Sequence, residues 1–297
     1  MDGADGTGAD GLGAGGVGAD AGGSSARARA YIGISGWRYA GWRGGFYPKG
    51  LQQRRELEYA AERFDSVEIN GSFYSLQRPE SYERWRDETP EGFVFAVKGG
   101  RYITHMLRMQ NARAALANFF ASGVLALGDK LGPVLWQLPE RVRFDAEVLD
   151  AFFTLMPRTT GEALTLAREH DAKLEGRSWL GEVVDRPLRH VLEPRHPTFD
   201  SDECAEVLAR HDVGMVIADS AGKWPMISRV TTDVVYVRLH GSEELYVSGY
   251  SPEELADWAT RCRAWLSEGR AVYVYFDNDA KVHAPFDAMN LRALLDA

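Results

Sequence analysis

The sequence predicts an α/β protein built as a single (β/α)8 barrel of the TIM type with parallel strands. Eight short apolar segments recur between residues 31 and 297, and segments with helical spacing of apolar residues follow most of them. Several of these segments, such as VGMVIAD, are almost wholly apolar, which is typical of parallel strands covered on both faces. The length also fits, because the chain has 297 residues and one such barrel commonly uses ~250.

The predicted elements follow one another in regular order. Strands are expected at residues 31–35, 66–70, 93–98, 132–138, 189–193, 213–219, 234–240 and 271–276. Helices are expected at residues 51–64, 80–87, 109–122, 145–156, 160–170, 200–210, 251–266 and 286–296. Two helix starts carry signals: Asp200 suits an N-cap, and Ser251 with Pro252 and Glu254 suits a capped first turn.

One βα unit is irregular, because residues 220–232 after the sixth strand show no helical pattern. The alternative architecture is a doubly wound open sheet. That fold would place a glycine-rich phosphate loop after the first strand, and the segment ISGWRYAGW matches neither G-x-G-x-x-G nor a P-loop. Strand count and length therefore favour the closed barrel.

Residues 1–30 form a separate part of the chain. They contain ten Gly, eight Ala and four Asp, and no Trp, Phe, Tyr or Ile. Such a composition cannot bury enough apolar surface to offset the entropy of ordering, and it lacks the basic start and apolar core of a signal peptide. We expect a disordered tail over residues 1–30, unless the start site is misassigned, and a barrel domain over residues 31–297.

Composition limits the class of function. Lys and Arg total 34 against 43 Asp and Glu, a net charge of −9, which disfavours broad coating of nucleic acid. No apolar stretch approaches the ~20 residues needed to cross a bilayer, so we expect no membrane partner. The two cysteines, Cys204 and Cys262, form no metal-type cluster and suit a reducing compartment. We expect a soluble cytoplasmic protein.

Polar residues stand at the carboxyl end of almost every predicted strand, where barrel enzymes hold their active sites. In the second strand, side-chain alternation puts Glu68 and Asn70 on one face and the apolar Val67 and Ile69 on the other. The face against the helices must be apolar, so Glu68 and Asn70 should point into the barrel. The same reasoning turns inward Ser35, Trp37, Lys98, Gln137, Glu193, Arg195, Asp219, Arg238 and His240, and either Asp277 or Asn278.

Buried charges at this density are costly unless they are paired or used in chemistry. Internal pairing, for example of Glu193 with Arg238, is one interpretation of each residue alone. The convergence of so many strand ends on polar side chains favours a functional site for the whole set.

Six segments, in this order, resemble the YecE-like family of barrel proteins, a domain of unknown function: ISGWRYAGW, SVEINGSFY, FVFAVKGGRYITH, LEPRHPTF, VYVRLHG and YFDNDAKVHAPFDA. The resemblance covers about residues 31–297 and implies a TIM-type barrel but no particular reaction. The matching positions are Gly36, Trp37, Glu68, Asn70, Phe73, Tyr74, Lys98, Glu193, Arg195, His196, Asp219, Arg238, His240, Gly241 and Asn278. Many members end the last strand with two adjacent Asn, whereas Asp277 precedes Asn278 here.

The mixed charge of the predicted mouth indicates an enzyme, a hydrolase or a lyase, that uses acid/base chemistry on a small phosphorylated or carboxylated anion. We expect catalytic roles for Glu68, Glu193 and His240. The expected substrate-binding residues are Trp37, Asn70, Tyr74, Lys98, Gln137, Arg195, His196, Asp219, Arg238 and Asn278. No cofactor motif is present in the sequence, so the cofactor is unknown.

Two other functions stay open. Glu68, Glu193, His196, Asp219 and His240 are candidate ligands of a metal-dependent phosphoesterase, by analogy of fold with endonuclease IV, although three nearby cations disfavour a divalent metal. Alternatively, the loop GWRYAGWRGGFYP could stack nucleic-acid bases or a sugar ring without catalysis. Packing of its rings against one another is the simpler expectation for most of them.

Overall fold

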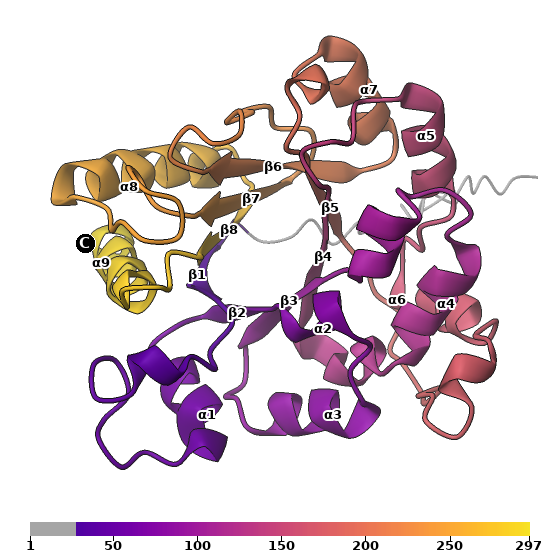
Figure 1. The fold of residues 1–297 in the computed structure, drawn as a ribbon, viewed down its shortest axis with the longest axis horizontal. Coiled ribbons are helices and arrows are strands. Elements are labelled where there is room, and N and C mark those ends of the chain that lie inside the picture. The colour runs from indigo at the N-terminus through magenta and orange to yellow at the C-terminus, as the bar shows by residue number, and fades with distance from the viewer. Residues whose placement is uncertain (1–27) are drawn as a thin grey trace, which may run out of the picture.

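Residues 28–297 are described by the computed structural model, and they form a closed barrel of eight parallel strands, as predicted (Figure 1). Each strand pairs with the next, and β8 pairs with β1 to close the ring. The strands are β1 (Ala30–Ser35), β2 (Ser66–Ile69), β3 (Val94–Lys98), β4 (Leu131–Gln137), β5 (His190–Glu193), β6 (Val213–Asp219), β7 (Val234–Leu239) and β8 (Ala271–Phe276). Of the predicted tail, residues 1–27 lie outside the described residues, and Ala30 already belongs to β1.

Helices surround the barrel on its outside (Figure 1). They are α1 (Glu56–Ala61), α2 (Gly71–Tyr74), α3 (Pro79–Asp87), α4 (Arg113–Ala121), α5 (Ala146–Thr154), α6 (Thr160–Ala167), α7 (Asp202–Arg210), α8 (Pro252–Ser267) and α9 (His283–Asp296). Across residues 28–297, every helix is too short or too polar to span a lipid bilayer.

The helix starts follow the sequence signals with one correction. Ser251 and Glu254 form the predicted capping box of α8, each side chain accepting from the other residue's backbone N–H. The predicted cap of α7 is wrong by one residue: Ser201, not Asp200, accepts from the Cys204 N–H. Asp200 instead pairs with Arg229 on the surface.

Several helices are shorter than predicted, and one unit has none. The stretch expected to be one helix over residues 51–64 forms a single 3-10 turn, Gln53–Arg55, followed by α1. Residues 220–233, all described, contain no helix, which confirms the predicted irregular unit after β6. The segment returns along the outside of the barrel as an irregular connection, where Ile227 packs in the outer layer and Thr231 bonds to the backbone of β6.

The core consists of two layers of side chains. The outer layer joins the strands to the helices, for example through Val67 and Ile69 of β2. The inner layer fills the barrel, and its amino-terminal half is rich in tyrosine: Tyr31 stacks on Tyr273 with ring centroids 4.6 Å apart. The apolar half of the barrel interior therefore ends in aromatic rings, above which the polar strand ends begin.

The predicted inward face of β6 is wrong. Val216 and Ala218 belong to the inner layer, whereas Met215 and Ile217 pack in the outer layer with the helices. Both faces of this strand are apolar, so alternation alone could not distinguish them. The inner face is marked by Gly214, where a Cβ atom would lie 3.0 Å from the Val191 side chain across the crowded interior.

Candidate functional site

A buried ion network fills the carboxyl end of the barrel, and Arg238 of β7 lies at its centre. Arg238 Nη2 donates to Glu68 Oε1 at 2.7 Å, and its Nε donates to Glu68 Oε2 at 3.0 Å. Its Nη1 donates to Glu193 Oε2 at 2.7 Å, and Nη2 also donates to Asp277 Oδ2 at 3.0 Å. One guanidinium thus joins β2, β5 and the residue that follows β8, and the predicted pairing of Glu193 with Arg238 is present.

Glu68 is bound on every side. The Tyr236 hydroxyl donates to its Oε2 at 2.6 Å, and the Ser35 hydroxyl donates to its Oε1. Asn70 Nδ2 in turn donates to Ser35 Oγ at 2.9 Å. These contacts satisfy a carboxylate with no exposed surface, which would otherwise be costly to bury.

The surrounding charges fix the protonation states of this network. Burial raises the pKa of Glu193, but Arg195 and Arg238 outweigh it and hold this pKa well below its usual range. The pKa of Asp277 is lowered to about 2, because Arg238 and His240 outweigh its burial. Burial and Arg238 lower the pKa of His240, whose Nδ1 donates to Asp277 Oδ2 at 3.0 Å. Near neutral pH, Glu193 and Asp277 are therefore charged and the His240 imidazole is neutral.

A cavity of about 610 Å³ opens above this network, a size that suits a small ligand. Its walls are Tyr39, Asn70, Phe73, Tyr74, Lys98, Arg101, His105, Gln137, Arg195, Tyr246, Asp277 and Asp279. Five predicted substrate-binding residues are therefore brought together here: Asn70, Tyr74, Lys98, Gln137 and Arg195.

The three residues predicted to be catalytic lie beneath this cavity rather than in it. Glu68, Glu193 and His240 are each 0% exposed, and none of them lines its walls. Arg238, predicted to bind substrate, is also 0% exposed and fully engaged with carboxylates. These four residues can position groups that reach the cavity, but in this arrangement they do not touch its contents.

Lys98 reaches the cavity without a polar partner. It ends β3, and no hydrogen bond or ion pair joins its Nζ to another residue between 28 and 297. Phe73 lies against it, with Nζ 4.5 Å from the ring centroid. Burial and the charge of Arg238 lower the pKa of Lys98 to about 8, although Glu68, Glu193 and Asp277 oppose this shift.

The backbone beyond Lys98 turns sharply into a π-helical turn, Tyr102–Met106. A side chain at position 99 would place its Cβ 2.3 Å from the Trp136 ring, so the close approach of β3 and β4 requires Gly99. This turn brings Arg101 and His105 to the cavity wall beside Lys98. Burial and Arg101 lower the pKa of His105 to about 4, so this imidazole is neutral at pH 7.

Arg195 presents a free fork to the cavity. Its Nε donates to Glu193 Oε1 at 2.8 Å, and its guanidinium carbon lies 3.6 Å from the ring centroid of Trp224. Neither terminal nitrogen has a hydrogen-bond partner among the described residues, and the side chain lines the cavity. Two parallel N–H donors in this geometry are suited to a carboxylate or a phosphate.

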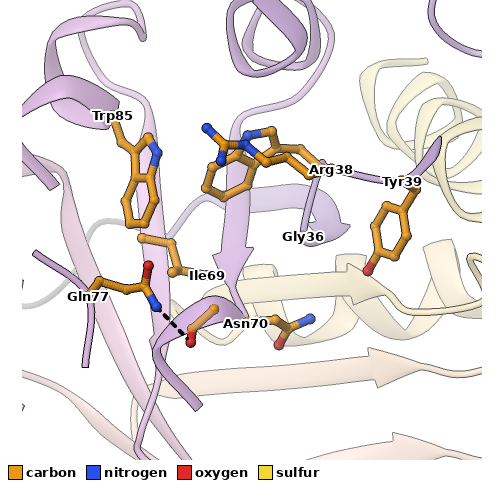
Figure 2. A pocket seen from close by; sticks show the side chains of 9 residues that line it. Gly36, Arg38, Tyr39, Ile69, Asn70, Gln77 and Trp85 are labelled. Atoms are coloured by element: carbon orange, nitrogen blue, oxygen red, sulfur yellow. Dashed lines mark hydrogen bonds between the residues drawn. The ribbon is translucent and has the colours of Figure 1, made fainter. Parts of the chain in front are cut away.

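A second pocket of about 240 Å³ adjoins the cavity and shares Tyr39 and Asn70 with it. Figure 2 shows Trp85 and Gln77 on one side of this pocket and Tyr39 on the other. Gln77 Nε2 donates to the Gly71 carbonyl at 2.9 Å, which holds the amide at the pocket wall. The pocket offers an aromatic surface next to the charged cavity.

Trp37 lies in this second pocket rather than at the charged mouth. It packs edge-on against Trp85, with ring centroids 5.3 Å apart. In the same loop, Trp42 packs edge-on against Phe46 at 5.6 Å, and Tyr47 donates its hydroxyl to the Trp37 carbonyl at 2.6 Å. Most rings of this loop thus pack against one another, as the simpler expectation had it.

Three further predicted site residues lie away from the cavity wall. Asp219, on the outer face of β6, accepts from the Tyr250 hydroxyl at 3.2 Å. Asn278 donates to Asp287 Oδ2 at 2.8 Å, away from the barrel centre. His196 Nδ1 accepts from the Thr198 N–H and caps a 3-10 turn. None of these three residues, each predicted to bind substrate, lines the cavity.

Sequence reasoning missed several residues of the cavity wall: Tyr39, Arg101, Tyr246, Asp279 and, as an undecided alternative, Asp277. Asp277 shared the alternation of Tyr273 and Tyr275, which would have selected it over Asn278. The others come from loops, where no periodicity reports the direction of a side chain. His105 also lines the cavity.

The metal-site alternative requires its candidate ligands to converge, and they do not. Among residues 28–297, no group of three or more His, Cys, Asp and Glu side chains is arranged to hold a metal ion. Glu68 and Glu193 face Arg238, while His196 and Asp219 lie elsewhere.

Comparison with known proteins places the chain in context. A family model described as "Protein of unknown function DUF72" matches residues 31–297. UPF0759 protein YunF of Bacillus subtilis is 24% identical over 290 residues, which cover 90% of this chain and 94% of that protein. UPF0759 protein YecE of Escherichia coli is 29% identical over 132 residues, 44% of this chain and 45% of that protein.

Two solved structures share the fold. A DUF72 family protein from Thermotoga maritima has a TM-score of 0.68 at 23% identity, covering 90% of this chain and 99% of that chain. A DUF72 family protein from Enterococcus faecalis also has a TM-score of 0.68, at 16% identity, covering 91% of this chain and 96% of that chain. At these identities the likeness bears on the fold alone.

Proposed function

The chain belongs to the DUF72 family, the YecE-like family that its sequence resembles, and from that premise we propose that it is an enzyme acting on a small phosphorylated or carboxylated anion. The reaction uses acid/base chemistry in the cavity at the carboxyl ends of the strands. The observation that carries this proposal is that two cationic side chains with free donors line one cavity. They are Arg195, whose terminal nitrogens have no partner among the described residues, and Lys98, whose Nζ has none.

Arg195 and Arg101 bind the anionic group. Glu193 accepts a hydrogen bond from Arg195 Nε, and the Trp224 ring packs against the guanidinium group. The guanidinium is therefore held in place before a ligand binds. The cost of ordering this side chain is thus met by the fold and not by the ligand.

The proton carriers are the groups on the cavity wall and not the buried carboxylates. Lys98, with a pKa of about 8, can accept a proton near neutral pH. Asp279 can supply one, because burial and the charge of Asp277 raise the pKa of Asp279 to about 6. Glu68, Glu193 and His240 act as positioning residues that hold Arg195, Asp277 and Arg238 in place.

We also propose a cytoplasmic location, which the two cysteines support. Cys204 and Cys262 are buried and unpaired, and burial raises the pKa of both thiols. Thiols of this kind suit a reducing compartment.

Titration calorimetry with inorganic phosphate and with pyruvate tests the anion site. Replacing Arg195 by Met should weaken binding about 10- to 100-fold, since a hydrogen bond to a charged group contributes ~1.5–3 kcal/mol. Arg54→Met is the matched control, because Arg54 is exposed and lies outside the cavity wall. No binding of either anion, or equal binding by both variants, would contradict the proposal.

A further inference from the structure

We propose that Lys98 forms an imine with the substrate, so that the substrate is an aldehyde or ketone that also carries the anionic group. This inference rests on the proposed function, since Arg195 and Arg101 hold the anion while Lys98 attacks the carbonyl carbon. It names the substrate class as a small anionic carbonyl compound.

The two buried lysines of the chain show why Lys98 is distinct. Lys130 is 9% exposed, and its Nζ donates to the Arg86 carbonyl and the Thr89 carbonyl, each at 2.6 Å, and to Thr89 Oγ1 at 3.1 Å. Lys98 is 8% exposed, yet its Nζ has no such acceptor among the described residues and faces the cavity. Lys130 is a structural lysine, whereas the Lys98 amine is left free to react.

Three carboxylates lie near Lys98 but are already occupied. Glu68, Glu193 and Asp277 each bind Arg238, and none forms an ion pair with Lys98. Arg238 therefore engages the nearby carboxylates, so that none of them is a direct partner of the buried amine, and Arg238 itself is a second cation near Lys98. A lysine that is desolvated beside another cation is the kind that proteins use as an amine nucleophile.

The charged groups around Lys98 come from several elements. Besides burial, Arg238 of β7 lowers the pKa of Lys98, whereas Glu68 of β2, Glu193 of β5 and Asp277 after β8 raise it. Arg101, Arg195, Asp279 and the neutral His105 line the same cavity. Burial and the four charges together place the pKa of Lys98 at about 8, so about a tenth of the amine is unprotonated at pH 7.

The chemical step balances without any further reactant. The Lys98 nitrogen bonds to the carbonyl carbon, the C=O electron pair moves to oxygen, and Asp279 protonates that oxygen. The Asp279 carboxylate then takes a proton from the nitrogen, which gives the neutral carbinolamine. Asp279 next protonates the hydroxyl group, which leaves as water while the nitrogen lone pair forms the C=N bond, and the remaining proton on nitrogen returns to the carboxylate. Amine and carbonyl give imine and water, with no change of oxidation state.

Borohydride trapping tests the inference, because reduction converts an imine into a stable secondary amine that peptide mass mapping locates. The probes are pyruvate and dihydroxyacetone phosphate, and acetone and dihydroxyacetone are their uncharged counterparts. The chain has six lysines, so each can be followed separately. We expect the adduct at Lys98 at pH 7 to exceed that at a lysine of ordinary pKa by on the order of a hundredfold.

Charge and position provide the controls. The anionic probes should label Lys98 at least tenfold more than their neutral counterparts, and Arg195→Met should remove this difference. Lys98→Arg keeps the charge but forms no imine, so it should abolish the adduct, whereas Lys49→Arg at an exposed site should not.

The outcomes separate this inference from the proposed function. Pyruvate binding by calorimetry without labelling of Lys98 above the other lysines overturns the imine and leaves the anion site standing. Neither binding nor labelling overturns both. Should Lys98→Arg fail to fold, Lys98→Met with circular dichroism as a check of folding replaces it.

Discussion

Two buried cations of the site, Arg238 and Lys98, should respond in opposite ways to removal. Arg238 is surrounded by carboxylates, so it is required for their burial. Lys98 has no such partner and lines the cavity. Burial of its protonated amine therefore lowers the free energy of unfolding. The contrast separates a residue kept for the structure from one kept for chemistry.

Arg238→Met should lower the free energy of unfolding by ~3–5 kcal/mol, because it leaves Glu68 and Glu193 buried without a cation. Adding Glu68→Gln to that variant should restore part of the loss. Urea unfolding at pH 7 measures both. A loss below ~1 kcal/mol would contradict the role of Arg238 as the centre of the network.

Lys98→Met should raise the free energy of unfolding at pH 7 by about 1–3 kcal/mol. The folded pKa of about 8 lies below the ordinary value near 10.4, so folding disfavours the protonated amine. This cost is absent above the unfolded pKa and fully present once the pH has fallen below the folded one.

Urea unfolding of Lys98→Met and the parent at pH 7 and pH 10 therefore gives the check. The advantage of the variant should shrink as the pH rises from 7 to 10. A variant less stable than the parent at pH 7 would show that the amine has a stabilising partner.

At the scale of elements, the helix-less segment between β6 and β7 contributes directly to the site. Trp224 lies under the Arg195 guanidinium and donates its Nε1 to Glu140 Oε2 at 3.1 Å. The beginning of this segment, directly after β6, therefore supplies the ring that supports Arg195.

Trp224→Ala should weaken binding of pyruvate about three- to thirtyfold, since a cation–π contact contributes ~0.5–2 kcal/mol. Trp265→Ala is the matched control: Arg261 lies 5.3 Å from that ring centroid, but Trp265 is on α8 and not at the cavity. Calorimetric titrations compare them. Equal losses in the two variants would mean that the effect is one of general stability.

The strands were easier to predict than the direction of their side chains. Order, parallel pairing and the irregular unit after β6 follow from apolar runs and spacing. In β2, polar and apolar residues alternate, so Glu68 was placed correctly in the interior. In β6, both faces are apolar, so Asp219 was assigned to the wrong face. Loop residues such as Tyr246 could not be predicted at all, because no alternation applies to them.

The charge of the whole molecule differs from the charges gathered in the cavity. The net charge is −9, while Lys98, Arg101 and Arg195 line one cavity together with Asp277 and Asp279. The net charge of the chain therefore disfavours an extensive nucleic-acid-binding surface, but it does not reveal this local cluster of cations. Because these side chains are partly shielded from water, their electrostatic attraction for an anion is stronger than at the open surface.

Acid stability of the whole fold should depend on His190, far from the cavity. Its Nε2 donates to the Pro157 carbonyl at 2.8 Å, and its Nδ1 accepts from Trp136 Nε1 at 3.2 Å, so the folded form is the neutral imidazole. Burial lowers the pKa of His190 to about 4. Its stabilising contribution is complete above pH ~6.5 and is lost as the pH falls toward 4.

His190→Gln should therefore be less sensitive to acid than the parent. Between pH 7 and pH 4, the parent should lose roughly 3 kcal/mol more free energy of unfolding than this variant. Urea midpoints at the two pH values measure the difference. Parallel losses in both proteins would show that His190 is not what limits acid stability.

The proposed activity requires an anion to bind in the cavity at the carboxyl ends of the strands, between Arg195 and Lys98. A crystal structure of the protein soaked with pyruvate tests it most directly. We expect density for the carboxylate at the free terminal nitrogens of Arg195, with the keto carbon directed at Lys98 Nζ. Pyruvate found only at surface sites, with this cavity holding water, would contradict it.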